Sequence, residues 1–416
     1  MKIAIIGGGA AGLMTAATIH EADPSAEIFL IERNNGLGKK VLISGGGRCN
    51  VTTGVHDLST VLTKYPRGGK FLSSAMHQFS PEAVYAWFEA HGVPLKIEND
   101  LRVFPQSDNG EDIVRVFEKV LHSSRVHTLL NTQATKIEKR DGSFLIFLKN
   151  EEAPLSVDKV VLTTGGQAYR QTGSTGDGYA FDISLGHTIT PLAPSLNAFF
   201  TKEKWPADIS GLSFQKATIT ANLKKRISFT GPFLFTHKGV SGPAIFALSS
   251  LVAFETYDAT KPLEITIDLF PDTSNDELMA ILQNAIHTNP KKNLPNVLTV
   301  IVPKSFAEIV CGLLKISTDR HVIELSKKEL ITIVEWIKAI PLQVIARGAG
   351  DEFVTAGGVN LKEVDPTTME SKISPGLYFA GEILDIDGFT GGFNLQASWA
   401  TGHLAGERIA ALDQRS

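Results

Sequence analysis

The sequence predicts an α/β protein whose Rossmann-like nucleotide-binding fold is discontinuous along the chain. Two observations carry this prediction. A short apolar strand at 2–6 runs directly into a glycine-rich turn at 7–12 and a helix, and a second apolar strand follows at 27–31. A strand leading into a glycine-rich turn returns only from residue 376, after a long region of different texture. The fold therefore starts the chain, is interrupted, and is completed by the C-terminus.

The turn at 7–12 has the pattern G-x-G-x-x-G between a strand and a helix. Gly7 allows the tight turn, Gly9 lets backbone approach a pyrophosphate, and Gly12 lets the helix pack closely on the strand. The N-terminus of the following helix presents free N–H groups to phosphates. Glu32 ends the second strand, about 20 residues further on, where a carboxylate accepts hydrogen bonds from an adenosine ribose. This unit predicts a cofactor that contains ADP.

The remaining elements are expected from periodicity and from start and stop signals. Helices are expected at 80–92, 111–122, 275–287, 305–316 and 326–338, with a last one at the C-terminus. Strands are expected around 126–137, 143–149, 157–163, 216–223, 226–229, 263–269, 342–346, 353–361 and 376–380. The change of texture predicts a first part of the nucleotide-binding domain at 1–187, an inserted domain at 188–350 (β-rich at 188–272, helical at 274–340), and a C-terminal part at 351–416.

Composition narrows the class of protein. The chain has 416 residues, 43% hydrophobic and 20% charged, as in ordinary soluble globular proteins. A net charge of −4 gives no electrostatic reason to expect nucleic acid or an anionic membrane as a partner. No run of 18 apolar residues predicts a membrane span, and the first strand begins too early for a signal peptide, so we expect a cytoplasmic protein. The sequence carries no indication of oligomeric state.

Cysteine and histidine usage excludes two kinds of site. The two cysteines, Cys49 and Cys311, form no C-x-x-C pair, so no redox disulfide of the usual kind is expected. The 11 histidines are scattered without the spacing of a metal site, and we expect no metal.

The C-terminal glycine segments favour FAD over NAD. Gly381-Glu382 ends the strand at 376–380, as a contact to a ribityl chain requires, and Gly391-Gly392 opens a helix rich in small residues. The N-terminus of that helix would stabilise the negative charge of reduced flavin. A further glycine loop, Ser44 to Asn50, can press bare backbone against a flat ring. FAD is long enough to need both ends of the chain.

These segments together resemble one family. The strings at 44–50, 173–178, 235–243 and 354–359, and the segment at 381–396, occur in this order in the BaiN-like (YhiN-like) bacterial FAD-dependent oxidoreductases, and the match runs essentially end to end. The resemblance implies a fold of the two-dinucleotide-binding-domain type, with an inserted, mainly β domain and a helical subdomain. The family is more distantly similar to fumarate-reductase-type flavoproteins, but their substrate motifs have no counterpart here, so dicarboxylate chemistry is not carried over. Family members bear names from amine oxidase to enone reductase, so the resemblance fixes the cofactor better than the substrate.

The residues expected to bind FAD lie in several separate segments. They are Gly7, Gly9, Ala10, Ala11, Gly12, Glu32, Arg33, Lys40, Ser44, Gly45, Gly46, Arg48, Cys49, Asn50, Ala134, Thr164, Gly165, Gly166, Asp177, Gly381, Glu382, Asp387, Gly391, Gly392, Asn394 and Leu395. Arg48 is a candidate ligand of a phosphate or a flavin carbonyl, with a salt bridge to a loop acid as the alternative.

Two residues are the leading candidates for proton transfer at a substrate, whereas Asp385 and Asp387, which could also aid proton transfer, are expected to be binding groups near the ribityl hydroxyls. His237 lies in a turn of the inserted region, and histidine is the side chain best suited to this task near neutral pH; the alternative is a structural histidine at a strand end. Cys49 follows an arginine, and a nearby cation lowers the pKa of a thiol; the alternative is a small residue chosen to fit beneath the ring.

Two classes of function remain open. The first is an FAD-dependent oxidoreductase that transfers hydride between flavin and a small organic substrate. The chain has no second G-x-G-x-x-G after a strand, so either NAD(P)H docks transiently in the substrate cleft or the substrate itself reduces the flavin. The second class is a non-catalytic or redox-sensing flavoprotein, although a long insert favours an enzyme. A tRNA-modifying flavoprotein would require a basic surface, which the net charge does not supply.

Overall fold

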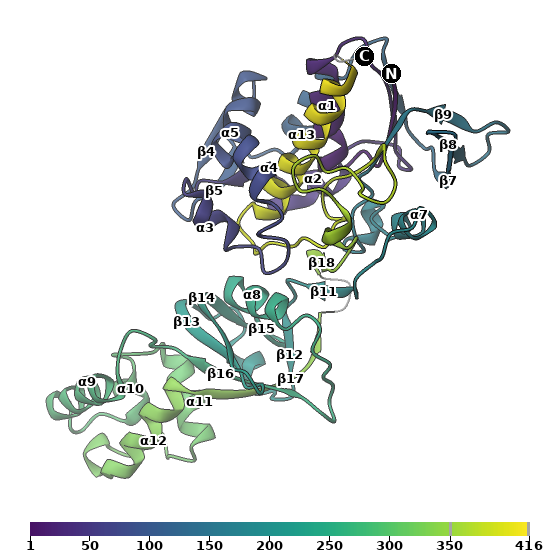
Figure 1. The fold of residues 1–416 in the computed structure, drawn as a ribbon. Helices are drawn as coiled ribbons and strands as arrows, with labels where there is room; N and C mark the ends of the chain where they lie inside the picture. The colour runs from purple at the N-terminus through teal and green to yellow at the C-terminus, as the bar shows by residue number, and fades with distance from the viewer. Residues whose placement is uncertain (349–351, 414–416) are drawn as a thin grey trace. The chain divides into compact units, whose positions relative to one another are not determined.

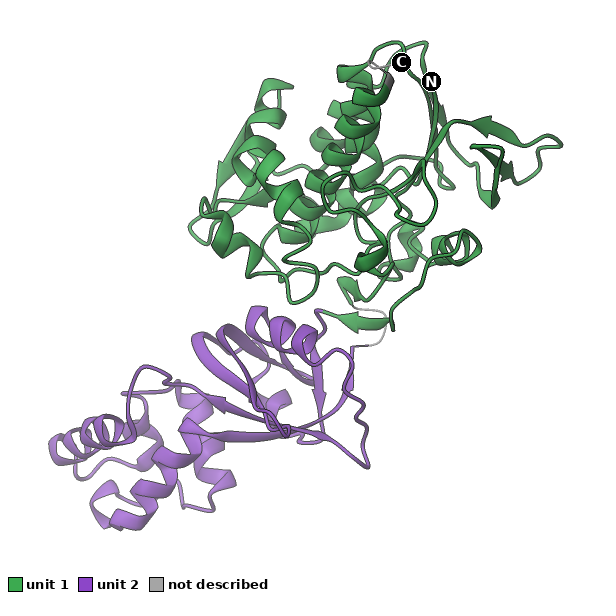
Figure 2. Ribbon diagram, viewed as in Figure 1, with its two compact units in different colours: residues 1–195, 350–416 green, residues 196–349 purple. Residues whose placement is uncertain are grey.

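The computed structural model describes residues 1–348 and 352–413, which form two compact units. Unit 1 contains residues 1–195 and 350–416, and unit 2 contains residues 196–349 (Figure 2). The insertion expected from the sequence at 188–350 overlaps unit 2 over its whole length. The expected insertion begins eight residues before unit 2 does.

Unit 1 is built on a five-stranded parallel sheet with the strand order β19-β10-β1-β2-β6. Its strands are β19 (Leu377–Phe379), β10 (Lys159–Leu162), β1 (Lys2–Ile6), β2 (Glu27–Ile31) and β6 (Val126–Leu129). The first and last thirds of the chain therefore meet in one sheet, because β19 pairs with β10 in parallel. Strand β1, at the centre, has four consecutive buried residues, as a strand covered on both faces requires.

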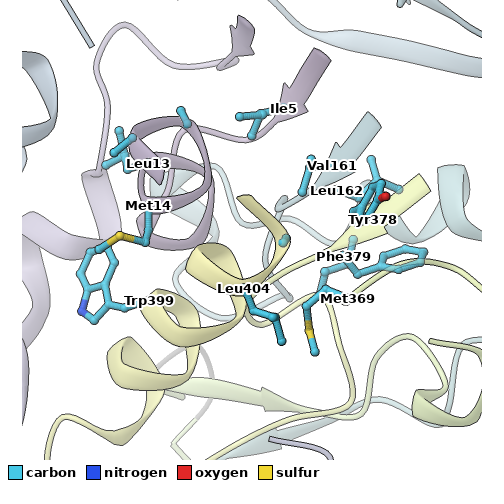
Figure 3. Packing of buried hydrophobic residues seen from close by; sticks show 14 of the residues in the cluster. Ile5, Leu13, Met14, Val161, Leu162, Met369, Tyr378, Phe379, Trp399 and Leu404 are labelled. Atoms are coloured by element: carbon cyan, nitrogen blue, oxygen red, sulfur yellow. The ribbon is translucent and has the colours of Figure 1, made fainter. Parts of the chain in front are cut away.

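Two long helices from opposite ends of the chain pack against each other beside this sheet: α1 (Ala10–Ala22) and α13 (Phe393–Asp413) (Figure 1). Small residues allow the close approach. A Cβ added at Gly402 would stand 2.5 Å from the carbonyl oxygen of Ala11, and one at Gly406 would stand 3.0 Å from that of Thr15. Figure 3 shows the core around them, where Leu13 and Met14 of α1 and Trp399 and Leu404 of α13 lie among buried residues of the sheet.

Smaller elements complete unit 1. Its other helices and turns are α2 (Lys39–Ile43), η1 (Ser44–Gly47), α3 (Leu58–Leu62), α4 (Ser73–Gln78), α5 (Pro81–Ala90), α6 (Glu111–Val120), η2 (Arg170–Thr172), α7 (Gly178–Ser184) and η5 (Leu361–Glu363). Its other strands form the sheets β3 (Thr52–Thr53), β5 (Arg102–Pro105), β4 (Leu95–Ile97); β7 (Ala134–Arg140), β8 (Ser143–Leu148), β9 (Leu155–Val157); and β11 (Ala193–Ser195), β18 (Val354–Ala356). Helix α5 begins as the sequence predicts, with Ser80 capping the backbone N–H of Ala83 and Pro81 in the first turn.

Unit 2 consists of a closed barrel followed in space by a helical part. The barrel has the strand order β12 (Phe199–Thr201), β15 (Gly239–Ser241), β14 (Ile227–Thr236), β13 (Ser213–Ala221), β16 (Leu263–Asp268) and β17 (Ile340–Arg347), with η3 (Trp205–Ile209) and α8 (Pro243–Leu251) beside it. The helical part comprises α9 (Asn275–Thr288), α10 (Leu294–Leu298), α11 (Lys304–Leu313), η4 (Val322–Glu324) and α12 (Lys327–Lys338). Helices α9 and α12 both start with a capping box, Ser274 with Glu277 and Ser326 with Glu329.

Three expectations about the elements need correction. The strand expected around 126–137 is two strands in different sheets, β6 and β7, separated by a turn with positive φ at Asn131. The strand expected at 353–361 is only three residues long, since Gly357 and Gly358 with positive φ end it. Finally, the β-rich part of the insert closes into a barrel through the short strands β12 and β15, which are too brief to give a periodic signal.

Candidate functional site

The turn between β1 and α1 has the geometry of a phosphate-binding turn. Gly7 has a φ of +111°, and a Cβ there would stand 2.7 Å from the carbonyl oxygen of Thr163. A Cβ at Gly12 would clash with the carbonyl oxygen of Gly7. A Cβ at Gly9, in contrast, would meet no protein atom within 4 Å, so nothing in the fold itself requires a glycine at this position. A ligand pressed against the backbone would require it.

The N-terminus of α1 fits an anion. Among the described residues no side chain caps this N-terminus. The first turn of the helix, which includes Ala10 and Ala11, contains no acidic residue. Its backbone N–H groups and the positive end of the helix dipole are therefore available to a diphosphate.

Glu32 stands beside this turn at the end of β2, and its carboxylate is held firmly. One oxygen accepts a hydrogen bond from the backbone N–H of Gly8 at 2.8 Å, and the other accepts from the backbone and side-chain nitrogens of Asn34 at 2.8 and 2.7 Å. The side chain is nearly buried, and the remaining lone pairs of its two oxygens can accept hydrogen bonds from ribose hydroxyls. Arg33 next to it pairs with Asp177 at 2.7 Å, which brings the segment around 173–178 to the same place.

The loop after β10 lies against the same turn. Thr163 donates its hydroxyl to the backbone oxygens of Ile6 and Gly7. Gly165 has a φ of +72°, and Gly166 approaches the side chain of Thr355 so closely that its Cβ would stand 2.6 Å from Oγ1. The hydroxyl of Thr164 is buried and has no hydrogen-bond partner among the described residues. Ala134, which was also predicted to bind FAD, is the buried first residue of β7.

The glycine loop at 44–47 is an open backbone turn. Gly45 and Gly46 have left-handed φ values of 57° and 71°, so side chains are disfavoured there. A Cβ at Gly46 or Gly47 would meet no protein atom within 4 Å, while Ser44 is tied down by donating its hydroxyl to the carbonyl of Val41. This exposed stretch of bare backbone suits contact with a flat ring.

Arg48 takes the second of the two roles considered for it. Its guanidinium pairs with Glu98 at 2.7 Å and with Asp108 at 3.3 Å, and it lies 3.8 Å above the centre of the Phe104 ring. Hydrogen bonding to Glu98 raises its pKa. The predicted phosphate or flavin-carbonyl contact therefore has a strong competitor inside the protein.

The expectation of a reactive thiol at Cys49 is wrong. The side chain is fully buried, and burial raises the pKa of the thiol to about 12, although a hydrogen bond with Ser44 acts in the opposite direction. The positive charge of Arg48 does not activate it, because that charge is neutralised by two carboxylates. A buried neutral thiol packs as a small apolar side chain, as the alternative interpretation held. Asn50 beside it accepts a hydrogen bond from the backbone N–H of Val103 at 3.3 Å.

The C-terminal glycine segment completes the site. Gly381 has a φ of +78° and approaches Ala11 of the first turn of α1, so both ends of the chain meet there. Glu382 forms an ion pair with Lys40 at 2.5 Å, which joins this segment to α2. A Cβ at Gly392 would clash with the carbonyl oxygen of Thr52.

The turn before α13 is fixed by side chains. Asn394 both accepts a hydrogen bond from the N–H of Gly388 and donates one to its carbonyl, each at 2.8 Å. Leu395 packs on the core of unit 1. Asp387 is fully buried, pairs with Arg67 through both oxygens, and accepts a hydrogen bond from Ser195, so its carboxylate is engaged within the protein.

His237 lies in the turn between β14 and β15 of unit 2 and is exposed. No hydrogen bond joins its ring to another residue in the described part of the chain. The neighbouring Lys238 lies 5.0 Å from the centre of the Phe200 ring. His237 is therefore available to a substrate, but no described residue of unit 2 fixes its tautomer.

Two buried polar residues on α7 were not predicted. Asp182 is fully buried, neither of its oxygens has a partner among the described residues, and burial raises its pKa well above the usual value. Tyr179 is buried with an unpartnered hydroxyl, and burial raises its pKa as well. The sequence does not reveal their burial, because a single polar residue in a short helix is normally expected to face solvent.

The described residues offer neither a metal site nor a membrane span. No group of three or more His, Cys, Asp or Glu side chains could hold a metal ion, and no helix has the length and apolar character that crossing a membrane requires.

Comparison with known proteins places the chain in a family. The model of the HI0933-like protein Rossmann domain matches residues 1–408. A 3-dehydro-bile acid delta(4,6)-reductase of Clostridium scindens is 31% identical over 98% of this chain and 99% of its own length. A ribosomal RNA dihydrouridine synthase of Haemophilus influenzae is 29% identical over 96% of both chains.

A solved structure shares the fold. The Mycobacterium smegmatis Sdh1 complex in the apo form has a TM-score of 0.50 at 15% identity, covering 100% of this chain and 68% of that chain. At this level of identity the likeness shows the fold alone. The family match over nearly the whole length, together with the relative that is 31% identical, establishes that the chain belongs to the HI0933-like family of FAD-binding Rossmann-type flavoproteins.

Proposed function

We propose that the protein is an FAD-dependent reductase that adds hydride to a carbon–carbon double bond conjugated with a carbonyl group. The observation that carries the proposal is the chemistry shared by two relatives with different substrates. A 3-dehydro-bile acid with Δ4,6 double bonds is a conjugated ketone, and dihydrouridine is uridine whose double bond next to the C4 carbonyl has been reduced. Both names describe the same bond change on unlike molecules.

The residues of unit 1 support binding of FAD in a defined orientation. The N–H groups at the start of α1 would hold the diphosphate, and Glu32 would accept hydrogen bonds from the adenosine ribose. Gly381 and Glu382 would contact the ribityl chain, and the loop at 44–47 and the turn before α13 would contact the ring. FAD, once reduced, would pass a hydride on to the substrate.

The reaction needs a proton as well as a hydride. Hydride adds to the β-carbon of the conjugated system, and a proton must reach the α-carbon to complete the saturated product. Cys49 cannot deliver it, since its thiol is buried and remote from solvent. His237 is exposed and of the right chemical type, and we propose it as the proton donor. NADH or NADPH is the proposed reductant of the flavin, which then passes the hydride to the substrate.

The test is anaerobic flavin bleaching followed by reoxidation. NADH or NADPH should bleach the flavin absorbance, and a conjugated enone, such as a 3-oxo-Δ4 steroid, should restore it with formation of the saturated ketone. Reduction of the flavin by amines, with no response to any enone or to uridine-containing RNA, would contradict the proposal and favour an oxidase. Absence of any redox turnover would favour the non-catalytic alternative.

One observation favours an RNA substrate as a second candidate. The net charge of −4 is distributed unevenly: residues 196–349 carry 17 Lys and Arg against 14 Asp and Glu, whereas the rest of the chain carries 23 against 30. Unit 2 is thus positive, at +3, and its β13–β14 turn exposes Lys224, Lys225 and Arg226. The argument from the whole-chain charge against nucleic acid does not hold for this unit. The RNA arm of the assay above decides between the two substrates.

A further inference from the structure

The chain leaves unit 1 once, to form unit 2, and then returns to unit 1. The strand before the departure and the strand after the return pair with each other. Strand β11 ends at Ser195, the last residue before unit 2, and β18 begins at Val354, shortly after the chain returns. The two strands pair antiparallel, with Ser195 opposite Val354 and Ala193 opposite Ala356. We call this pair the linker strands.

The entry strand is held by the C-terminal cofactor segment. The hydroxyl of Ser195 donates to Asp387 at 2.8 Å, and both side chains are fully buried. Arg67 donates to both oxygens of the same carboxylate, so the buried negative charge is compensated. Asp387 belongs to the segment from Gly381 to Gly392 that leads into α13.

The exit strand is held by the other cofactor segment. The hydroxyl oxygen of Thr355 accepts a hydrogen bond from the backbone N–H of Gln167 at 2.7 Å, directly after the glycines that follow β10. The contact is tight, because a Cβ at Gly166 would stand 2.6 Å from this oxygen. Thr355 is almost completely buried.

We infer that Ser195, Asp387, Gln167 and Thr355 form a linker clamp that couples occupancy of the FAD site to the order of the linker strands. Each linker strand is held by a side-chain hydrogen bond, which is buried at Ser195 and partly buried at Thr355, and each bond ends on a segment proposed to contact FAD. A ligand that orders those two segments therefore also orders the strands that carry unit 2. Coupling of this kind is reciprocal: if bound FAD favours the ordered linker strands by some factor, ordered linker strands strengthen FAD binding by that factor. Loosening the clamp should therefore weaken FAD binding. Asp387 and Thr355 are positioning residues in this scheme.

The inference rests on the proposed binding of FAD by these segments, and it is independent of the substrate. The experiment is amide hydrogen exchange of peptides covering 193–195 and 354–356, measured with FAD bound and after its removal. In the wild-type protein, removal of FAD should accelerate exchange in the linker strands at least tenfold. In the double variant Ser195→Ala/Thr355→Val the strands should exchange fast in both states, with a smaller response to FAD.

Three further readouts keep the test decisive. The Kd for FAD should rise about tenfold in the double variant, and the hydroxyl-retaining substitutions Ser195→Thr and Thr355→Ser should restore both exchange and affinity. Peptides of the β13–β14 hairpin in unit 2 report whether the FAD-free protein stays folded; if it does not, affinity and rescue alone test the coupling. Ser371→Ala is the matched control, since Ser371 is a buried serine of unit 1 that bonds to His187 and to neither linker strand.

The outcomes separate this inference from the proposed function. If the wild-type protein binds FAD but its linker strands exchange at the same rate with and without it, the clamp does not couple the two and the inference is overturned. An equal loss of affinity in the Ser371→Ala control would also overturn it, since the effect would then be general destabilisation. If the wild-type protein does not bind FAD, the proposed function itself fails.

Discussion

At the scale of single residues, some glycines of the first turn are required by the fold, and another would be required by a bound ligand. Gly7 and Gly12 are required by the protein itself, because side chains there would meet backbone atoms. Gly9 is surrounded by open space. No protein atom requires a glycine there, whereas a diphosphate bound against the backbone would, and this makes Gly9 a sharp test of the cofactor site.

Replacing Gly9 by Val should abolish retention of FAD without unfolding the protein. A Cβ at this position would meet no protein atom within 4 Å, but the side chain would occupy the space needed by the diphosphate. Flavin released by heat from the purified variant, measured by fluorescence, gives the answer. Gly312→Val is the matched control, since Gly312 on α11 is equally unhindered and lies in unit 2. A Gly9→Val protein that keeps stoichiometric FAD would remove the site from this turn.

Asp182 should make the protein less stable as pH rises. Burial raises the pKa of this carboxyl well above its usual value, so the folded protein holds a proton that the unfolded chain releases. The stability is full below the unfolded pKa, about 3.9, and is lost as pH rises toward the raised folded pKa. Asp182→Asn should therefore raise the melting temperature at pH 8, because the amide is neutral without having to hold a proton in the folded state. At pH 4.5 the gain should shrink; a gain independent of pH would contradict this account.

At the scale of elements, turns carry most of the chemistry that distinguishes this chain from a plain sheet-and-helix protein. The β14–β15 turn of the barrel presents His237 and Lys238. Exposure of His237 means that its replacement costs little folding energy, in contrast to the buried His187. Function and stability can therefore be separated at this turn.

His237→Gln should lower the rate of substrate reduction while leaving the bound flavin and its spectrum intact. Proton transfer by a positioned side chain contributes roughly 100- to 10,000-fold. The measurement is stopped-flow reoxidation of reduced enzyme by enone at several pH values, alongside the rate of flavin reduction by nicotinamide, which should not change. His287→Gln, at an exposed position of α9 in the same unit, serves as the control. Equal reoxidation rates in both variants would assign His237 no part in catalysis.

At the scale of the whole molecule, the insertion is topologically simple. Unit 2 starts and ends at two strands that are already paired in unit 1, and each unit has its own hydrophobic core. The five-stranded sheet and the α1–α13 pair, which form the proposed FAD site, lie wholly within unit 1. Removal of unit 2 should therefore leave the cofactor-binding fold of unit 1 intact.

A chain in which residues 196–353 are replaced by Asn-Gly should fold and retain FAD but lose turnover. Ser195 and Val354 face each other in register, so a two-residue hairpin turn can join them, and Asn-Gly is the preferred sequence for such a turn. FAD content, the flavin spectrum and reduction by enone are the measurements. Gly9→Val in the shortened chain should again release the flavin. A shortened chain that folds without FAD would show that unit 2 contributes to its retention.

The sequence alone determined the features that have local causes. A strand, a glycine turn and a helix at 1–22 interact with their immediate neighbours, so spacing predicts them, and the structure places β1, α1 and β2 where the pattern does. The same holds for the capped start of α5. The order of five motifs along the chain identified the family and hence FAD, and the match of the family model over residues 1–408 confirms it.

Only the tertiary structure decided the features that depend on partners far away in the chain. The carboxylates that neutralise Arg48 come from other loops, and the burial that raises the pKa of Cys49 comes from packing, so the reactivity suggested by the Arg48–Cys49 dipeptide was misleading. Ser195 and Asp387 are 192 residues apart and meet only because the final part of the chain joins the sheet begun by the first. Spacing along a chain carries no information about such contacts, because they arise from the burial of separate segments against one another rather than from the conformation of any single segment.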